Sequence, residues 1–167
     1  FKLVVYNPSL EELKGIVSMT QKTMGEVANV ACNAEQLLAM RETANQIPVA
    51  DEVLTFAMTL ISATHPDSEC ASEAAKKYVR LGSSPRGGQA LISAAKVLAL
   101  MNGRFNVSYS DVASLAFPVL RHRMKMNFEA IAERVSPDEV IRMILTEVCK
   151  KCNVRLDAGI LNTAETG

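Results

Sequence analysis

The sequence contains one helix-start signal after another, and this feature limits the fold more than any other. Ser9 has Glu12 three residues later, and Asn33 has Gln36 at the same distance, which is the spacing of a capping box. The run SPDE at residues 136–139 places a cap, a proline and two acids in the order that opens a helix. Apolar residues follow these signals at helical spacing. The chain is therefore predicted to be all-α.

The predicted helices leave little room for other structure. They begin at Ser9, run from Asn33 to about Gln46, from about Ala50 to Ala63 and from Pro85 to Met101, begin again at Ser108 or Ser110, and follow Ser136. Phe1 to Tyr6 alone has the composition of a strand, and residues 66–81 are either a short helix or a mobile insertion. We expect an extended arm over residues 1–8, a helical domain over residues 9–150 and a tail over residues 151–167.

The segment 85–101 has the strongest apolar pattern of the chain and is predicted to be its central helix. The core is expected to include Leu60, Leu91, Ala94, Leu98 and Leu115. A chain of 167 residues can bury roughly 70% of the surface that its unfolded form exposes. The length therefore suits a single helical domain with short appendages.

The charges of the chain balance, and this disfavours some partners. Eighteen Lys and Arg against eighteen Asp and Glu give a net charge of zero, so no overall field draws the chain to nucleic acid or to an anionic membrane. The longest mostly apolar run, residues 90–101, contains Ser93 and Lys96 and is too short to cross a bilayer. The chain opens at Phe1 without a methionine or a signal-peptide pattern. We expect a cytoplasmic protein of which this chain is one part.

Two of the four cysteines, Cys149 and Cys152, have the CxxC spacing of metal sites and redox sites. No second CxxC and no pair of histidines completes a zinc site in the sequence. We expect reduced thiols near the end of a helix and no metal. A zinc or redox protein is the competing interpretation.

Residues 81–95 raise the question of a phosphate-binding loop. Gly82 and Gly87 lie five positions apart, as in the P-loop sequence G-x-x-x-x-G-K-[ST]. Gly88 and Gln89 stand where that loop needs a lysine and a hydroxyl, and the preceding residues are a poor central strand. The segment is therefore not predicted to be a P-loop.

Arg86 occupies an unusual place for a cation. With Ser84 as the N-cap and Pro85 at the first helical position, Arg86 lies at the second position, where a positive charge opposes the helix dipole. An arginine beside free backbone N–H groups suits a neighbouring anion. The alternative is a surface arginine that pairs with an Asp or Glu of the same chain.

Several motifs follow one another in a fixed order along the second half of the chain. They are Gly82-Ser83-Ser84-Pro85-Arg86, Gly103-Arg104 with Val107, Asp111-Val112, and Val119-Leu120-Arg121-His122-Arg123. In this order they resemble the C-terminal lid of MoxR-type AAA+ ATPases, which are related to the ATPase subunit of magnesium chelatase. The resemblance covers about residues 1 to 148.

The resemblance implies a function in ATP hydrolysis. In that family the arginine that opens this helix, here Arg86, is the second sensor and contacts the γ-phosphate, with Ser84 and Pro85 beside the nucleotide. ATP and Mg²⁺ would be held by an ATPase core, whose Walker A and Walker B motifs this chain lacks. The resemblance also implies a ring of subunits, expected to be hexameric, chaperone-like remodelling, and partners with von Willebrand A domains. The fragment alone is expected to bind ATP negligibly.

The chain departs from the family pattern at two places. Thr64-His65 stands where the family often has an arginine, and the segment 66–81 is long. The lid of this clade is also displaced, so Arg86 can serve the nucleotide of its own subunit or that of a neighbour.

The basic cluster Arg121, His122 and Arg123 has three interpretations. A structural or inter-subunit role is favoured, ahead of a nucleotide-linked role and of contact with nucleic acid. Arg104 is expected to cap the carbonyls of the preceding helix, and His122 to be a hydrogen-bonded packing residue. The competing function for the whole chain is a free-standing helical interaction or DNA-binding module, which the neutral charge disfavours.

Overall fold

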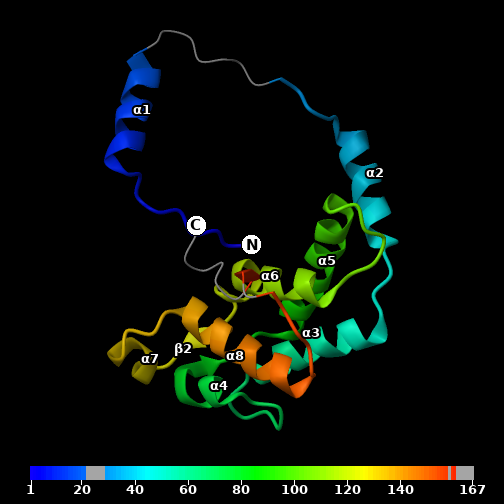
Figure 1. The fold of residues 1–167 in the computed structure, drawn as a ribbon, viewed down its shortest axis with the longest axis vertical. Coiled ribbons are helices and arrows are strands. Elements are labelled where there is room, and N and C mark those ends of the chain that lie inside the picture. The colour runs from blue at the N-terminus through cyan, green and yellow to red at the C-terminus, as the bar shows by residue number, and fades with distance from the viewer. Residues whose placement is uncertain (22–28, 158, 161–167) are drawn as a thin grey trace.

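The computed structural model of the chain describes residues 1–21, 29–157 and 159–160 and is mostly helical (Figure 1). Its elements in chain order are α1 (Leu10–Gln21), α2 (Ala34–Asn45), α3 (Asp51–Ala63), α4 (Glu73–Tyr78), β1 (Val79–Leu81), α5 (Pro85–Met101), α6 (Tyr109–Leu120), β2 (Lys125–Met126), α7 (Phe128–Ala132) and α8 (Pro137–Lys151). The prediction of an all-α fold is confirmed. No helix in the described part is both long enough and apolar enough to cross a membrane.

Hydrogen bonds at the helix starts confirm the capping signals of the sequence. Reciprocal capping boxes form at Ser9, Asn33, Ser108 and Ser136. Ser108, and not Ser110, caps α6, and its partner in the box is Asp111. Each box satisfies backbone N–H groups that the first turn of a helix leaves free. The starts of these helices are therefore set by local sequence.

The core lies where α3, α5, α6 and α8 meet, with α5 against α6 and α3 against both α5 and α8 (Figure 1). The largest fully buried side chains are Phe56 and Leu60 of α3, Leu91 of α5, Leu120 of α6, and Ile141, Ile144 and Leu145 of α8. Burying a side chain of this size contributes about 1.5–3 kcal/mol. The predicted core positions Leu60 and Leu91 are confirmed, and Leu115 packs partly buried against the same core.

The buried face of α5 differs from the face that the apolar pattern predicted. Leu91, Ala95 and Ala99 are fully buried, whereas Ala94 and Leu98 are only half-buried. The prediction of Ala94 and Leu98 as core residues is therefore wrong. The residues that let α5 approach its neighbours closely are mostly alanine and glycine, and these weigh little in an apolar pattern. Leu98 contributes more to an apolar pattern than alanine or glycine does, so the pattern predicted a buried face of α5 that is centred too close to Leu98.

Strands occur at places that the composition did not indicate. Phe1 to Tyr6 is exposed and forms no strand, so the prediction of strand character there is wrong. Instead β1 and β2 pair in antiparallel fashion, with Val79 opposite Met126 and Leu81 opposite Lys125. Strands of two or three residues have no alternation that a sequence could show. Their pairing brings the loop before α5 next to the segment that follows α6.

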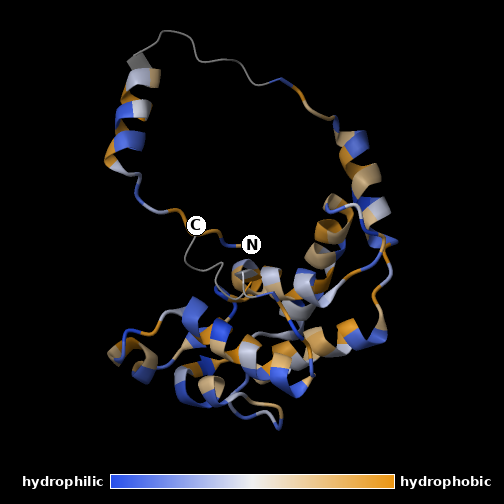
Figure 2. Ribbon diagram, viewed as in Figure 1, coloured by the Kyte–Doolittle hydropathy of each residue, from blue (hydrophilic) through white to orange (hydrophobic). Residues whose placement is uncertain are grey.

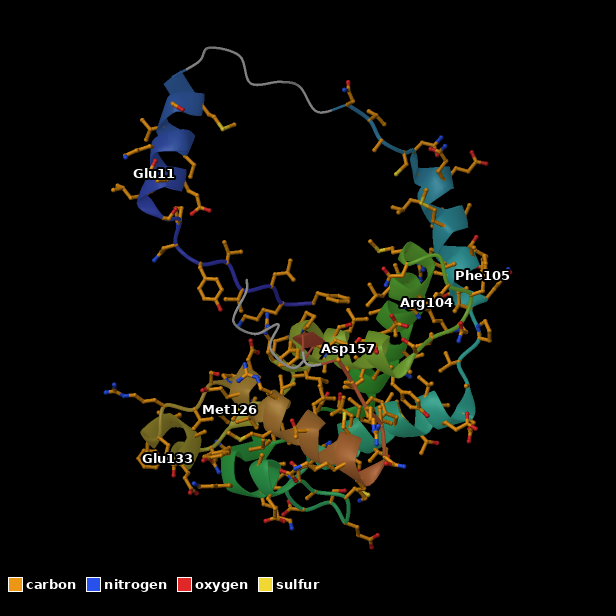
Figure 3. The ribbon with its side chains drawn as sticks, viewed as in Figure 1. Glu11, Arg104, Phe105, Met126, Glu133 and Asp157 are labelled. Atoms are coloured by element: carbon orange, nitrogen blue, oxygen red, sulfur yellow. The ribbon has the colours of Figure 1, made fainter. Side chains whose placement is uncertain are left out.

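The segment 66–81 is ordered by contacts with α7 and α8 and contains α4 and β1, as the short-helix interpretation predicted. The carboxylate of Glu147 in α8 accepts the backbone N–H of Glu73 at 2.9 Å and caps the start of α4. Tyr78 Oη donates to the carboxylate of Glu133 at 2.8 Å. Glu133 is labelled in Figure 3, at the edge of the helical body. The predicted tail over residues 151–167 lies in part outside the described residues.

Helix α1 stands apart from this body, and α2 contacts it through α5, although both helices carry exposed apolar residues (Figures 1 and 2). Leu13, Ile16 and Val17 of α1 lie at helical spacing, but each is 45% exposed or more. In α2 only Ala44, near the end of the helix, is buried. The apolar pattern therefore predicted these helices correctly but did not reveal which surface, if any, covers them.

Candidate functional site

The loop that precedes α5 is held in place by the end of α3. Thr64 is fully buried, and its Oγ1 donates to the Ile61 carbonyl at 2.6 Å and accepts the Ser83 N–H at 2.9 Å. The Nε2 of His65 lies 2.8 Å from the Ser83 carbonyl oxygen. Because a carbonyl only accepts, Nε2 carries the proton of this bond. Both peptide groups of Ser83 are thus fixed before the helix begins.

The two glycines of the P-loop-like spacing are explained by packing. A Cβ on Gly82 would lie 2.7 Å from the carbonyl oxygen of Thr64 and from the His65 ring. A Cβ on Gly87 would lie 2.0 Å from Ser83 Oγ. Neither position tolerates a side chain in this arrangement. The spacing therefore results from close contacts within the chain, which agrees with the rejection of a P-loop.

Arg86 projects from the first turn of α5 without a partner in the part of the chain that the structure describes. Ser84 is the N-cap, makes no side-chain capping bond, and is followed by Pro85 at the first helical position. Arg86 is exposed, and none of the described residues gives it a hydrogen bond or an ion pair. The alternative of an ion pair with a described carboxylate of the same chain is therefore not realised. The guanidinium is free to meet an anion from outside.

Arg104 has a structural role that differs from the predicted one. Its guanidinium binds the buried carboxylate of Asp111 in a bidentate pair, with N–O distances of 2.5 and 2.7 Å. The side chain therefore supports the capping box of α6. The prediction that it caps the carbonyls of α5 is wrong. Burial raises the pKa of Asp111, but hydrogen bonds from Arg104 and Ser108 lower it by more than burial raises it. The pKa therefore lies below its ordinary value. Figure 3 shows Arg104 beside α5 and close to Phe105.

Arg121 also has a structural role. It forms a bidentate pair with Asp138 at the start of α8, with N–O distances of 3.0 and 2.8 Å, and donates to the Lys2 carbonyl at 2.9 Å. The two charged side chains are 14% and 19% exposed. Arg121 thus ties α6 to α8 and to the N-terminal arm. A cleft of about 520 Å³ between the arm and α8 is lined by this pair and not by Arg86.

His122 and Arg123 occupy different environments, although they are neighbours in sequence. His122 is exposed and makes no hydrogen bond with a described residue, so the prediction of a packing residue is wrong. Arg123 is half-buried, and its Cδ lies 3.4 Å from the position that a Cβ on Gly87 would occupy. Its Nε is buried and has no hydrogen-bond partner. The structure therefore places Arg123, and not His122, beside the start of α5.

Sequence reasoning missed the roles of Thr64 and His65 and the proximity of Arg123 to α5. The polar pair at the end of the predicted helix 50–63 was the available signal for the first two. Both cysteines of the CxxC spacing are free thiols, and burial raises the pKa of the Cys149 thiol to about 11. Among the described residues no group of side chains is suited to hold a metal ion.

Comparison with known proteins gives this arrangement a context. Residues 71–144 match the family of AAA lid domains. The chain is 31% identical over 148 residues to Chaperone MoxR1 of Mycobacterium tuberculosis, covering 89% of this chain and 39% of that protein. It is 28% identical over 151 residues to the uncharacterized protein YeaC of Bacillus subtilis, covering 89% and 44%. A crystal structure of a candidate ATPase from Cytophaga hutchinsonii matches with a TM-score of 0.75 and 26% identity, covering 86% and 43%. The chain thus spans less than half the length of each relative.

Proposed function

We propose that this chain, which belongs to the AAA lid domains of MoxR-type AAA+ proteins, senses the phosphate end of an ATP molecule through Arg86. The nucleotide and its Mg²⁺ would be held by an ATPase core joined to this lid. Hydrolysis then needs attack of water on the γ-phosphorus and loss of ADP, and negative charge on the transferring group is stabilised by nearby cations. Arg86 supplies such a cation from the lid, so the position of the lid depends on whether the γ-phosphate is present.

The observation that carries this proposal is the contrast between Arg86 and the other motif arginines. Arg104 and Arg121 each hold a carboxylate of the chain in a bidentate pair. Arg86 has no such partner among the described residues and lies where its charge opposes the helix dipole. A folded chain gains nothing by placing a cation there, whereas a phosphate from another domain or subunit would gain two positive features at once.

The wider role follows from the relatives and stays part of the proposal. A protein built on this lid would assemble into a ring, with Arg86 reading the nucleotide of its own subunit or of the neighbouring one. We propose a hexameric ring, chaperone-like remodelling of client proteins in the cytoplasm, and cooperation with proteins that carry von Willebrand A domains. The similarity to a protein named Chaperone MoxR1 supports this direction.

The test is ATP hydrolysis by a protein in which this lid is joined to its ATPase core. Arg86→Ala removes the cation, and we expect the rate per folded molecule to fall about 10-fold or more. Arg86→Lys keeps the charge but loses the planar fork and should recover only part of the rate. Arg80→Ala, which removes another exposed arginine just before the loop, is the matched control and should leave the rate unchanged. A normal rate for Arg86→Ala would refute the proposal.

A further inference from the structure

Two buried polar atoms without partners lie around one glycine at the start of α5. In the described part of the chain, Ser83 Oγ and Arg123 Nε are the buried side-chain nitrogen and oxygen atoms that make no hydrogen bond. Ser83 is fully buried, and its Oγ lies 2.0 Å from the position of a Cβ on Gly87; Arg123 Cδ lies 3.4 Å from the same point. Buried polar atoms are nearly always bonded in native proteins. Their occurrence together at one place therefore indicates that a partner is missing there.

The fold holds Arg123 at this place by contacts on both sides of it. Leu120 and Met124 are buried in the core, and the Arg123 N–H donates to the Leu120 carbonyl at 2.8 Å. One residue further, Lys125 in β2 pairs with Leu81 in β1, immediately before the loop that leads into α5. The backbone of Arg123 is thus fixed beside the helix start. The side chain is available because none of the described residues binds it.

The surroundings of Arg123 carry positive charge that the described carboxylates neutralise only at Arg121. Arg121 is paired with Asp138, but no described carboxylate pairs with Arg123. The pKa of His122 lies below its ordinary value because of the partial desolvation of its ring and because of the positive charges of the N-terminal amine, Arg123, Lys2 and Arg121. This end of α6 therefore presents an uncompensated positive field beside the first turn of α5.

We propose that Arg123 and Arg86 together form a two-arginine site for a phosphate group across Gly87, with the hydroxyl of Ser83 as a further donor. The oxygens of a phosphate group can accept from both guanidinium groups, and Arg123 Nε would gain the acceptor that it lacks. The proposal rests on the proposed function in one respect, since the phosphate is the terminal one of a nucleotide held by another domain. It adds that one arginine is not enough to bind it.

The binding site can be tested on this chain with inorganic tripolyphosphate as the probe. The backbone amide signals of Gly87 and Gly88 are followed by NMR at constant ionic strength in wild type, Arg86→Gln, Arg123→Gln and Lys125→Gln. Glutamine keeps much of the stem that packs on Gly87, so the fold is retained. Lys125→Gln removes an equal charge two residues away, from an exposed side chain, and controls for general electrostatic attraction.

We expect each arginine substitution to weaken the binding of tripolyphosphate about 5-fold or more, because each removes a charged hydrogen bond to the phosphate. Lys125→Gln should weaken it less than about 2-fold, because salt screens an exposed charge that makes no direct contact. Equal effects of Arg123→Gln and Lys125→Gln would overturn the role of Arg123. Acetate that shifts the same amides as strongly as tripolyphosphate would also overturn the proposal, because the site would then recognise a carboxylate of a neighbouring subunit.

ATP hydrolysis by the protein with its ATPase core separates this inference from the proposed function. Arg123→Gln should raise the KM for ATP or lower kcat by about 5-fold or more, without lowering the thermal midpoint. If Arg86→Gln lowers turnover and Arg123→Gln does not, this inference fails and the proposed function stands. If neither substitution changes turnover while both weaken tripolyphosphate binding, the site exists and the proposed function fails.

Discussion

The two ends of α5 differ in whether their polar side chains have partners within the described part of the chain. At the C-terminal end, Arg104 and Asp111 form a bidentate pair that also completes the cap of the next helix. At the N-terminal end, Ser84 makes no side-chain cap, Arg86 has no partner among the described residues, and Ser83 Oγ is buried without a hydrogen bond. One end is complete within the chain, and the other is not.

The difference distinguishes residues that hold the fold from residues that we propose for contact with a partner. A buried polar atom without a hydrogen bond costs about 1–3 kcal/mol, so the chain is less stable than it could be at the start of α5. Departures of this kind from local rules are concentrated at functional sites. The comparison therefore assigns the Arg104 end to stability and supports our proposal that the Arg86 end serves binding.

Substitutions in the middle of α5 should give the largest loss in the free energy of unfolding, with which the effects at both ends can be compared. Leu91→Ala should lower the free energy of unfolding by about 2–5 kcal/mol, because Leu91 is fully buried. Leu98→Ala is the matched control on the same helix and should cost clearly less, since Leu98 is only half-buried. Urea denaturation of both variants measures the difference. Equal losses would show that the assigned buried face of α5 is wrong.

The C-terminal end should show the next largest effect. Arg104→Ala leaves the Asp111 carboxylate, which is 3% exposed, without its cation, and should lower the free energy of unfolding by about 1–3 kcal/mol. The exposed part of Arg104 keeps the loss below that of a fully buried pair. Thermal and urea unfolding at neutral pH measure it. A loss below about 0.5 kcal/mol would remove the contrast between the two ends.

The same pair predicts a dependence on pH. The pKa of Asp111 is lowered in the folded chain, despite the opposing effect of burial, by bonds from Arg104 and Ser108. A lowered folded-state pKa contributes stability that is fully present above the unfolded value of about 4 and is lost as the pH falls through the folded value. The difference in stability between wild type and Arg104→Ala should therefore shrink below about pH 4. A difference that stays constant down to about pH 2 would contradict this assignment.

The N-terminal end should respond weakly or with the opposite sign. Ser83→Ala removes a buried hydroxyl that has no partner, so stability should be unchanged or should rise by up to about 1 kcal/mol. The backbone bonds that Thr64 and His65 make to residue 83 remain in this variant. The melting temperature of the chain is the measurement. A clear decrease would mean that the hydroxyl has a stabilising partner in the folded chain.

Local signals predicted much of this structure because caps act within a few residues. The starts of α1 and α2 followed from capping boxes, and the starts of α5 and α8 followed from a serine N-cap before a proline. For α6 the sequence left Ser108 and Ser110 as alternatives, and the structure selects Ser108. These signals were enough to place Arg86 at the second position of its helix. Apolar spacing predicted α1 as a helix but did not show which surface covers its apolar face, because spacing is a property of the helix alone.

Long-range contacts could not be predicted because no local pattern encodes them. Arg123 reaches Gly87 only because β1 and β2 pair over a separation of more than forty residues, and strands this short carry no signal. The buried face of α5 was rotated because alanine and glycine, which allow close packing, weigh little in an apolar pattern. The candidate site was therefore predicted only in part, through Arg86.

The most direct test of this account is the unfolding free energy of Arg86→Ala, measured beside Arg104→Ala on the same chain. Arg86 opposes the dipole of α5 and binds no described residue, so its removal should leave stability unchanged or raise it by a few tenths of a kcal/mol, roughly. Arg104→Ala should be clearly destabilised in the same experiment. A loss for Arg86→Ala as large as that for Arg104→Ala would mean that Arg86 holds the fold, and the assignment of this end of α5 to phosphate sensing would be wrong.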